Sequence, residues 1–334
     1  MRYLDKRAQV ICDELKKLSV RQKQPLTGWM CKKGCFMRPE EADADAAPLT
    51  PFDSATMHWY GPDEHYWFTT KAVVPQSFDG KPLWMHVRTQ IDEWDDGKNP
   101  QFLLFVDGEI IQGLDMNHRD VLLTPAAQAG REYRLDLQAY TGTLHSEFNL
   151  IAEWWEVDAE IEGLYWDLQV PLQAFPRLDP QSRARMDLER ELNEAVNLLD
   201  LRTPYSPAFE NSVRQARQYL REHLYGALGG HDEVVATCIG HTHIDVAWWW
   251  TVAQTREKVA RSFATVLKLM DEYPGYRFMS SQPQLYQFLK ERYPEVYDKV
   301  RQRVAEGRWE PEGGMWVEAD CNLTSGESLV RQFI

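Results

Sequence analysis

Residues 234–245 read Val-Val-Ala-Thr-Cys-Ile-Gly-His-Thr-His-Ile-Asp. The apolar run that opens this stretch predicts a β-strand, and a helical pattern follows the three tryptophans at 248–250, which is the strand-helix order of an α/β barrel. Side chains two residues apart in an extended segment point to the same side, so we expect His241, His243 and Asp245 to share one face. Imidazole and carboxylate groups suit Zn²⁺ or a similar divalent ion. Histidines with only a structural role can occur in the same sequence pattern.

A second short strand-like stretch, within residues 307–322, also ends in acidic side chains, Glu318 and Asp320. Carboxylates are rarely buried unless they are paired or bound to a metal. Two strand ends that carry acids are therefore difficult to explain by packing alone. We expect both stretches to contribute to one site.

Four motifs stand in order in the last third of the chain. They are His-Thr-His-Ile-Asp-Val-Ala-Trp (241–248), Ser-Gln-Pro-Gln (281–284), Gly-Gly-Met-Trp-Val-Glu-Ala-Asp-Cys-Asn (313–322) and Ser-Gly-Glu-Ser-Leu-Val-Arg-Gln-Phe (325–333). Together they resemble the α-mannosidases of glycoside hydrolase family 38, and most closely the cytosolic and vacuolar type. The resemblance is specific over residues 234–334 and weaker before them.

The resemblance implies a role for each matching residue. His243 and Asp245 match the first two zinc ligands of the family, and Asp320 matches the carboxylate that both binds zinc and attacks the anomeric carbon. Trp248 matches the aromatic side chain on which the bound mannose rests. His241 matches a histidine that does not bind the ion directly, so it would orient a ligand or the substrate; a capped histidine at a strand end is the alternative.

The chemistry also limits what this chain can do. Hydrolysis with retention needs a carboxylate nucleophile, here Asp320, and a second carboxyl about 5 Å away. A divalent ion, zinc or cobalt, would hold the 2- and 3-hydroxyls of mannose. Glu318 could serve a substrate hydroxyl or be a solvated loop acid. Because the family's acid/base and fourth metal ligand would lie beyond Ile334, we expect an amino-terminal part of a longer enzyme, inactive alone.

Two other classes of function stay open. One is a non-catalytic sugar-binding or assembly fragment. The other is a metal-dependent amidohydrolase, which also opens its barrel with His-x-His but would not need the acids at 318 and 320 or the flanking tryptophans.

Composition predicts a soluble protein of the cytoplasm. The 37 basic and 51 acidic residues give a net charge of −14, which argues against nucleic acid or a membrane as partner. No signal-peptide core or membrane-spanning run is visible. We expect α-mannosides or mannose-containing oligosaccharides as substrates and a homo-oligomer.

The five cysteines suggest no disulfide framework. Cys31 and Cys35 lack a second pair of cysteines and do not predict a metal knuckle. We expect Cys321, beside Asp320, to be a small packed side chain, with a metal ligand as the alternative.

Four segments follow from the pattern along the chain. We expect an N-terminal helix (1–24), an antiparallel β-sandwich of jelly-roll type (25–178), a helical connector (179–230) that holds sandwich against barrel, and the first part of a catalytic α/β barrel (231–334). Asp107-Gly108 predicts a hairpin. The polar loop at 115–120 could approach the mouth of the site. Four tryptophans could be sugar platforms or core residues: Trp84, Trp94, Trp154 and Trp155.

Overall fold

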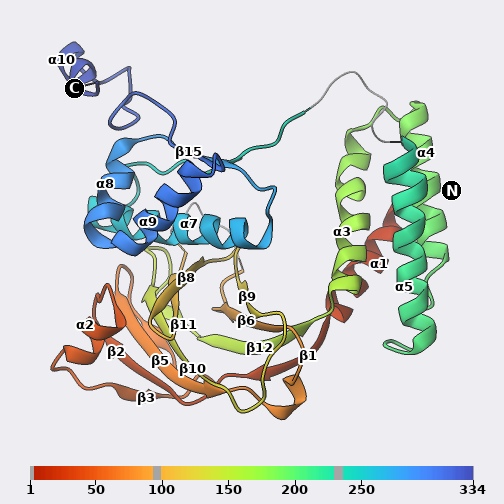
Figure 1. Ribbon diagram of the computed structural model, residues 1–334, viewed down its shortest axis with the longest axis horizontal. Helices are drawn as coiled ribbons and strands as arrows, with labels where there is room; N and C mark the ends of the chain where they lie inside the picture. The colour runs from red at the N-terminus through yellow and green to blue at the C-terminus, as the bar shows by residue number, and fades with distance from the viewer. Residues whose placement is uncertain (1–3, 93–98, 229–235, 334) are drawn as a thin grey trace. The chain divides into compact units, whose positions relative to one another are not determined.

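The computed structural model describes residues 4–92, 99–228 and 236–333 (Figure 1). The chain divides into two compact units. The first joins Met1–Gln24 to Trp155–Ala236, and the second joins Pro25–Trp154 to Thr237–Ile334. The expected boundary at Gly229-Gly230, together with the first two residues of the predicted strand at 234–240, lies outside the described residues.

The first unit is helical and has its own apolar core. Its long helices are α1 (Leu4–Leu18), α3 (Ala159–Ala174), α4 (Arg183–Asn197) and α5 (Pro207–Tyr219). Short turns continue them: η2 (Phe175–Arg177), η3 (Leu220–Tyr225) and α6 (Gly226–Leu228). Residues spaced three or four apart on these helices, such as Cys12 and Leu15 on α1, meet in one core.

The predicted N-terminal helix is too long at its carboxyl end. Helix α1 stops at Leu18, and strand β1 (Val20–Pro25) follows. The cause is tertiary, because Arg21 pairs with Asp158 at 2.6 Å and Gln22 donates a hydrogen bond to Glu156 at 2.8 Å. These partners favour an extended backbone where the local pattern favours a helix.

The predicted β-sandwich is too long, because residues 159–174 form helix α3. Asp158 caps this helix by accepting hydrogen bonds from the backbone N–H groups of Glu160 and Ile161. The buried apolar residues of α3 recur at helical spacing: Ile161, Leu164, Leu168 and Leu172. Both the cap and the spacing were visible in the sequence.

The second unit begins with two sheets, which we call the two-sheet region (residues 25–154). A six-stranded antiparallel sheet has the order β3-β2-β5-β10-β7-β8. Its strands are β2 (Trp29–Lys33), β3 (Thr50–Phe52), β5 (His65–Val73), β7 (Gln101–Val106), β8 (Glu109–Leu114) and β10 (Glu132–Tyr140). In a second sheet β12 (Ile151–Val157), β6 (Leu83–Arg88) and β9 (Asp120–Thr124) lie side by side. The smaller elements are α2 (Pro39–Ala44), β4 (Trp59–Tyr60), η1 (Gln76–Phe78) and β11 (Glu147–Phe148).

The hairpin predicted at Asp107-Gly108 is present between β7 and β8. Both residues have positive φ angles, 52° and 90°, and the register pairs Val106 with Glu109. Two consecutive positive φ angles are those of a type I′ turn, which asparagine or aspartate followed by glycine favours.

Both faces of the six-stranded sheet are buried, which explains its unbroken apolar runs. On β7, Phe102 and Leu104 pack in the core between the two sheets, whereas Leu103 and Phe105 face the opposite way and pack with residues of α7. Trp154 is buried in the core between the sheets and is therefore not a sugar platform. Trp84 and Trp155 are partly buried, and Trp94 lies outside the described residues.

The rest of the second unit, which we call the α/β segment (residues 237–334), contains a small parallel sheet. Strands β13 (Gly240–His241), β14 (Phe278–Met279) and β15 (Trp309–Glu310) pair in parallel in this order. Its helices are α7 (Val252–Glu272), α8 (Pro283–Arg292), α9 (Pro294–Ala305) and α10 (Gly326–Arg331). The strand predicted from 234 is shorter than expected, since residues 237–239 are exposed and only Gly240 and His241 pair with β14.

Helix α7 rests directly on the two-sheet region. A Cβ atom on Gly113 of β8 would lie 2.6 Å from the backbone oxygen of Arg261, so the helix can approach this closely only because residue 113 is glycine. Thr265 donates a hydrogen bond to the carbonyl oxygen of Gly113 at 3.1 Å. The predicted role of residues 179–230 as a connector stays a prediction. Among the described residues, no helix has the length and apolar character needed to cross a membrane.

Candidate active site

His243 and Asp245 follow β13 and lie against each other. His243 Nε2 is 3.1 Å from an Asp245 carboxylate oxygen, and both side chains are about half exposed. Ile244 between them is only 4% exposed and packs in the core beneath α7. The predicted alternation of polar and apolar side chains therefore holds at these three residues.

Glu318 makes specific contacts, although its side chain is 43% exposed. Its Oε2 atom lies 2.9 Å from His243 Nδ1, and Ser281 donates a hydrogen bond to its Oε1 atom. The imidazole of His243 is thus flanked by a carboxylate at each ring nitrogen. We call His243, Asp245 and Glu318 the motif cluster.

Gln282 joins the two loops that carry the motif cluster. Its side-chain amide donates to the carbonyl oxygen of Ile244 at 2.9 Å and accepts from the backbone N–H of Glu318 at 3.2 Å. The residue is buried, and its φ angle of 68° is in the left-handed region. Gln282 lies in the motif at 281–284, but the sequence predicted no role for it. The signal that the sequence offered was a glutamine directly before Pro283, the residue that begins α8.

The hydrogen bonds of Asp320 lie within its own loop. Its Oδ1 atom accepts a hydrogen bond from the backbone N–H of Asn322 at 2.8 Å, and its side chain is exposed. Where the structure describes the chain, the triads of metal-binding side chains with ligand atoms within 4.8 Å of one another do not include Asp320. Cys321 is exposed, so it is not the packed side chain that we expected.

His241 and Trp248 border the same site. The Nδ1 atom of His241 is 3.1 Å from the carbonyl oxygen of Met279, which fixes the ring against β14. Trp248 is 53% exposed, and its ring meets that of Trp250 edge to face. Trp250 in turn donates its indole N–H to the carbonyl oxygen of Asp245. An exposed aromatic face beside polar groups suits a sugar ring.

A cavity of about 500 Å³ connects the motif to the two-sheet region. His243, Asp245 and Trp248 line one part of it, and residues 113–118 of the two-sheet region line another. Residues 115–118 of the polar loop therefore line the same cavity as the motif. Asp115 and His118 of this loop are 3.2 Å apart. The hydrogen bond that His118 donates to the Asp115 carboxylate raises the pKa of His118 above its ordinary value, although burial opposes the shift.

Lys258 of α7 also lines this cavity. Burial lowers the pKa of Lys258 to about 8, and the nearby charge of Arg261 adds to the shift. The amine lies 4.3 Å from the centre of the Trp250 ring, a favourable contact between a cation and an aromatic face. The cavity therefore presents both carboxylates and an amine to a ligand.

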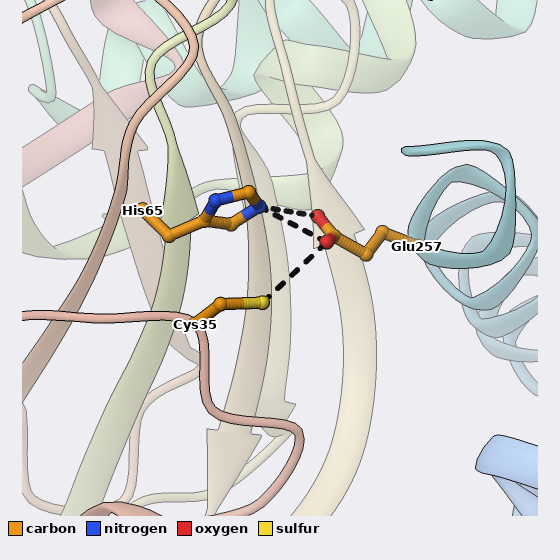
Figure 2. A group of neighbouring side chains, drawn as sticks. All are labelled: Cys35, His65 and Glu257. Atoms are coloured by element: carbon orange, nitrogen blue, oxygen red, sulfur yellow. Dashed lines mark hydrogen bonds and ion pairs between the residues drawn. The ribbon is translucent and has the colours of Figure 1, made fainter. Parts of the chain in front are cut away.

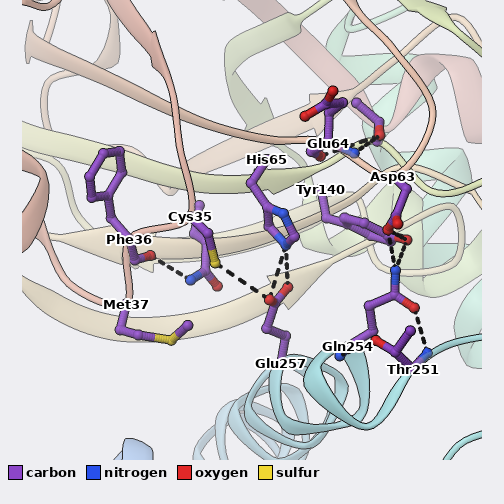
Figure 3. Close-up of polar contacts among 12 residues, drawn as sticks. Cys35, Phe36, Met37, Asp63, Glu64, His65, Tyr140, Thr251, Gln254 and Glu257 are labelled. Carbon is purple, nitrogen blue, oxygen red and sulfur yellow. Dashed lines mark hydrogen bonds and ion pairs between the residues drawn. The ribbon is translucent and has the colours of Figure 1, made fainter. Parts of the chain in front are cut away.

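Polar contacts position the first turns of α7, the helix that carries Lys258 (Figure 3). Thr251 and Gln254 form a capping box at the start of the helix. The Gln254 amide also donates to Asp63 and Tyr140 of the two-sheet region, and Tyr140 donates to Asp63 at 2.9 Å. The side of the cavity formed by α7 is thus fixed to the neighbouring sheet.

Comparison with known protein families identifies the α/β segment. Residues 233–334 match the N-terminal domain of the glycosyl hydrolases of family 38. The motifs around His243 and Glu318 fall within this match. Over this segment the chain is therefore similar to glycoside hydrolase family 38.

Individual relatives extend the similarity toward the amino terminus. The chain is 35% identical to alpha-mannosidase G of Dictyostelium discoideum over 52% of its length, and 28% identical to human alpha-mannosidase 2C1 over 88%. It spans 16% and 28% of the lengths of these two proteins. Among solved structures, a beta-glucuronidase of Faecalibacterium prausnitzii aligns with 41% of this chain and 32% of its own, at 10% identity and a TM-score of 0.27. That similarity is too low to bear on fold or function.

Proposed function

We propose that this chain supplies the first part of the catalytic site of a metal-dependent, retaining α-mannosidase. The observation that carries the proposal is the motif cluster, in which Glu318 holds one nitrogen of His243 while the other nitrogen faces Asp245 beside a cavity. In this proposal β13, β14 and β15 are the first three strands of an α/β barrel, and the two-sheet region is a sandwich of jelly-roll type.

The donor set fits a zinc or cobalt ion. Histidines that bind metals usually donate their second ring N–H to a carboxylate, which fixes the tautomer and the direction of the ring. Glu318 stands where such a partner is required, 2.9 Å from His243 Nδ1. His243 Nε2 and the Asp245 carboxylate would then hold the ion, with Asp320 as a further ligand. The bound ion would orient the hydroxyl groups of the sugar and stabilise charge that develops during the reaction.

The other residues have separate roles in this proposal. Asp320 is the nucleophile that forms the glycosyl ester, because retention needs a carboxylate at the anomeric carbon. Trp248 offers its ring to the apolar face of mannose. His241, held by the carbonyl oxygen of Met279, orients the substrate or a ligand. No residue of this chain is assigned as the acid/base.

Terminal α-mannosides are the substrates that we propose, and the cytoplasm is the proposed compartment. The names of the relatives support the substrate, and the net charge of −14 supports a partner that is neither nucleic acid nor an anionic membrane.

The decisive test is the substitution Asp320→Asn in the longest gene product that contains this chain. An amide is nearly isosteric with the carboxylate but cannot form the ester, so kcat on an aryl α-mannoside should fall by on the order of 10⁴-fold or more. The circular dichroism spectrum should not change. Near-normal turnover by the variant would refute the nucleophile assignment.

The same assay on residues 1–334 alone tests the alternative of a sugar-binding fragment. We expect no turnover with zinc or cobalt added, because one catalytic carboxylate cannot replace two. Turnover at the rate of the longer protein would show that the acid/base lies within these residues.

A further inference from the structure

Three side chains that could hold a metal ion lie between the two-sheet region and α7, apart from the motif cluster (Figure 2). It consists of Cys35 from the loop after β2, His65 at the start of β5, and Glu257 of α7. One ligand atom from each residue lies within 4.8 Å of the other two. In Figure 2 the thiol, the imidazole and the carboxylate point toward one another. We call these residues the interlayer cluster.

We propose that the interlayer cluster is a binding site for a divalent zinc-like ion that links the two-sheet region to α7. The site is separate from the motif cluster and does not depend on the proposed mannosidase activity. Thiolate, imidazole and carboxylate are the three types of side chain that bind zinc in proteins.

The distances are close to those that a tetrahedral ion requires. Bonds of about 2.0–2.3 Å place neighbouring ligand atoms about 3.4–3.5 Å apart. His65 Nε2 is 3.0 Å from both oxygens of Glu257, and Cys35 Sγ is 3.7 Å from Glu257 Oε1. Shifts of a few tenths of an ångström would therefore admit the ion. Because Cys35 is an exposed residue, a water molecule could supply the fourth ligand.

The surroundings also fit a bound cation. Glu257 is only 4% exposed, and carboxylates at such depth are normally paired or bound to a metal. Arg261 approaches Glu257 Oε2 at 3.4 Å, which leaves Oε1 on the side of Cys35. Binding would release the thiol proton to solvent, so that one thiolate and one carboxylate balance the two charges of the ion. An ion pair of His65 with Glu257 alone would not explain why the thiol points into the same space.

Cobalt provides a direct probe, because a bond between cobalt and a thiolate gives an intense charge-transfer absorption in the near ultraviolet. We would titrate residues 1–334 with Co²⁺ alone, as wild type and as the His243→Ala, Cys35→Ser and Cys238→Ser variants. The band should appear in all of them except Cys35→Ser, whose affinity should fall at least about 100-fold, since even partners of ligands contribute 10–100-fold. Cys238→Ser is the matched control, because Cys238 is an exposed cysteine elsewhere. A missing band in the wild type, or a band that survives Cys35→Ser, would overturn the proposal.

A second measurement needs no variant and so does not depend on a variant folding. Alkylation of each cysteine by iodoacetamide would be followed by mass spectrometry with and without Zn²⁺. Zinc should slow the reaction of Cys35 about tenfold or more, because a metal-bound thiolate is not a free nucleophile. Cys238 and Cys321 should react at unchanged rates. An unchanged rate at Cys35, or an equal slowing at all three cysteines, would reject the site.

Discussion

The motif cluster and the interlayer cluster contain similar chemical groups but are assembled in different ways. In the motif cluster, His243 and Asp245 are two residues apart, their side chains are about half exposed, and Glu318 completes the group. In the interlayer cluster, Glu257 is 222 residues from Cys35 and 192 from His65, and it is almost fully buried. Two residues of the motif cluster belong to one short sequence motif. The residues of the interlayer cluster meet only because α7 packs on the two-sheet region. A search for motifs finds the first kind of site and misses the second.

Replacing one histidine in each cluster should separate activity from stability. In the longest gene product that contains this chain, His243→Ala should lower mannosidase activity at least about 100-fold through loss of metal, with partial recovery at high zinc. His65→Ala should instead lower the free energy of unfolding by about 1–3 kcal/mol, because it removes hydrogen bonds from the buried carboxylate of Glu257. Aryl α-mannoside hydrolysis and urea denaturation measure the two effects. An equal loss of activity in both variants, with no loss of stability in His65→Ala, would show that the clusters are not independent.

Glu318→Gln tests whether a carboxylate is needed behind His243. The amide keeps the size of the side chain but removes the charge that orients the imidazole. We expect zinc affinity to fall about 10–100-fold, as measured by competition with a chelator. Glu312→Gln, at an exposed acid of the same loop, is the matched control. Equal affinities of the two variants would remove Glu318 from the site.

Gln282→Ala tests the bridge between the loops of the motif cluster. It leaves the carbonyl oxygen of Ile244 and the N–H of Glu318 without this partner. The free energy of unfolding should fall by about 1–3 kcal/mol in urea denaturation. Gln302→Ala on the exposed face of α9 should change it by less than about 0.5 kcal/mol. If the two substitutions cost the same, Gln282 does not hold the loops together.

The smallest effect is expected at the rim of the cavity, where Asp115 faces His118. Because the pKa of His118 is raised in the folded protein, the stabilisation from this pair is fully present below the unfolded pKa and is lost as the pH rises through the folded pKa. Asp115→Asn should return the pKa of His118 toward its ordinary value in a titration followed by nuclear magnetic resonance. The side chains are partly exposed, so solvent screening keeps the change in stability small. An unchanged pKa would show that Asp115 does not cause the shift.

Local signals in the sequence predicted those elements whose cause is local. Helix α7 is present from Val252 to Glu272, close to the predicted 251–272, because Thr251 and Gln254 cap its start and its apolar residues recur at helical spacing. The hairpin at Asp107-Gly108 follows from two residues that accept positive φ angles. The helical pattern of α3 is weaker, because Trp166 and Val170 are apolar residues on its exposed side and Pro171 lies within it.

Elements whose cause is tertiary could not be predicted in this way. Residues 20–24 become a strand because distant carboxylates, including Asp158, pair with their side chains. The strand expected before His241 is short, because only Gly240 and His241 pair with β14 among the described residues. The contact of Glu318 with His243 depends on the path of the loop after β15, which Gln282 fixes from another segment. The position of Asp320 relative to His243 remains a prediction.

The close approach of Gly113 to Arg261 has a consequence for biosynthesis. A ribosome completes the two-sheet region before it makes α7, and domains fold in that order as they emerge. The newly made helix α7 therefore packs on sheets that are already folded. Because residue 113 is glycine, the helix backbone has room to approach β8. Protein synthesis thus completes the two-sheet region first and the α/β segment second. A chain permuted to begin at residue 237 would have to fold α7 before its template exists, and it would expose the apolar face of that helix to aggregation until the sheets arrived.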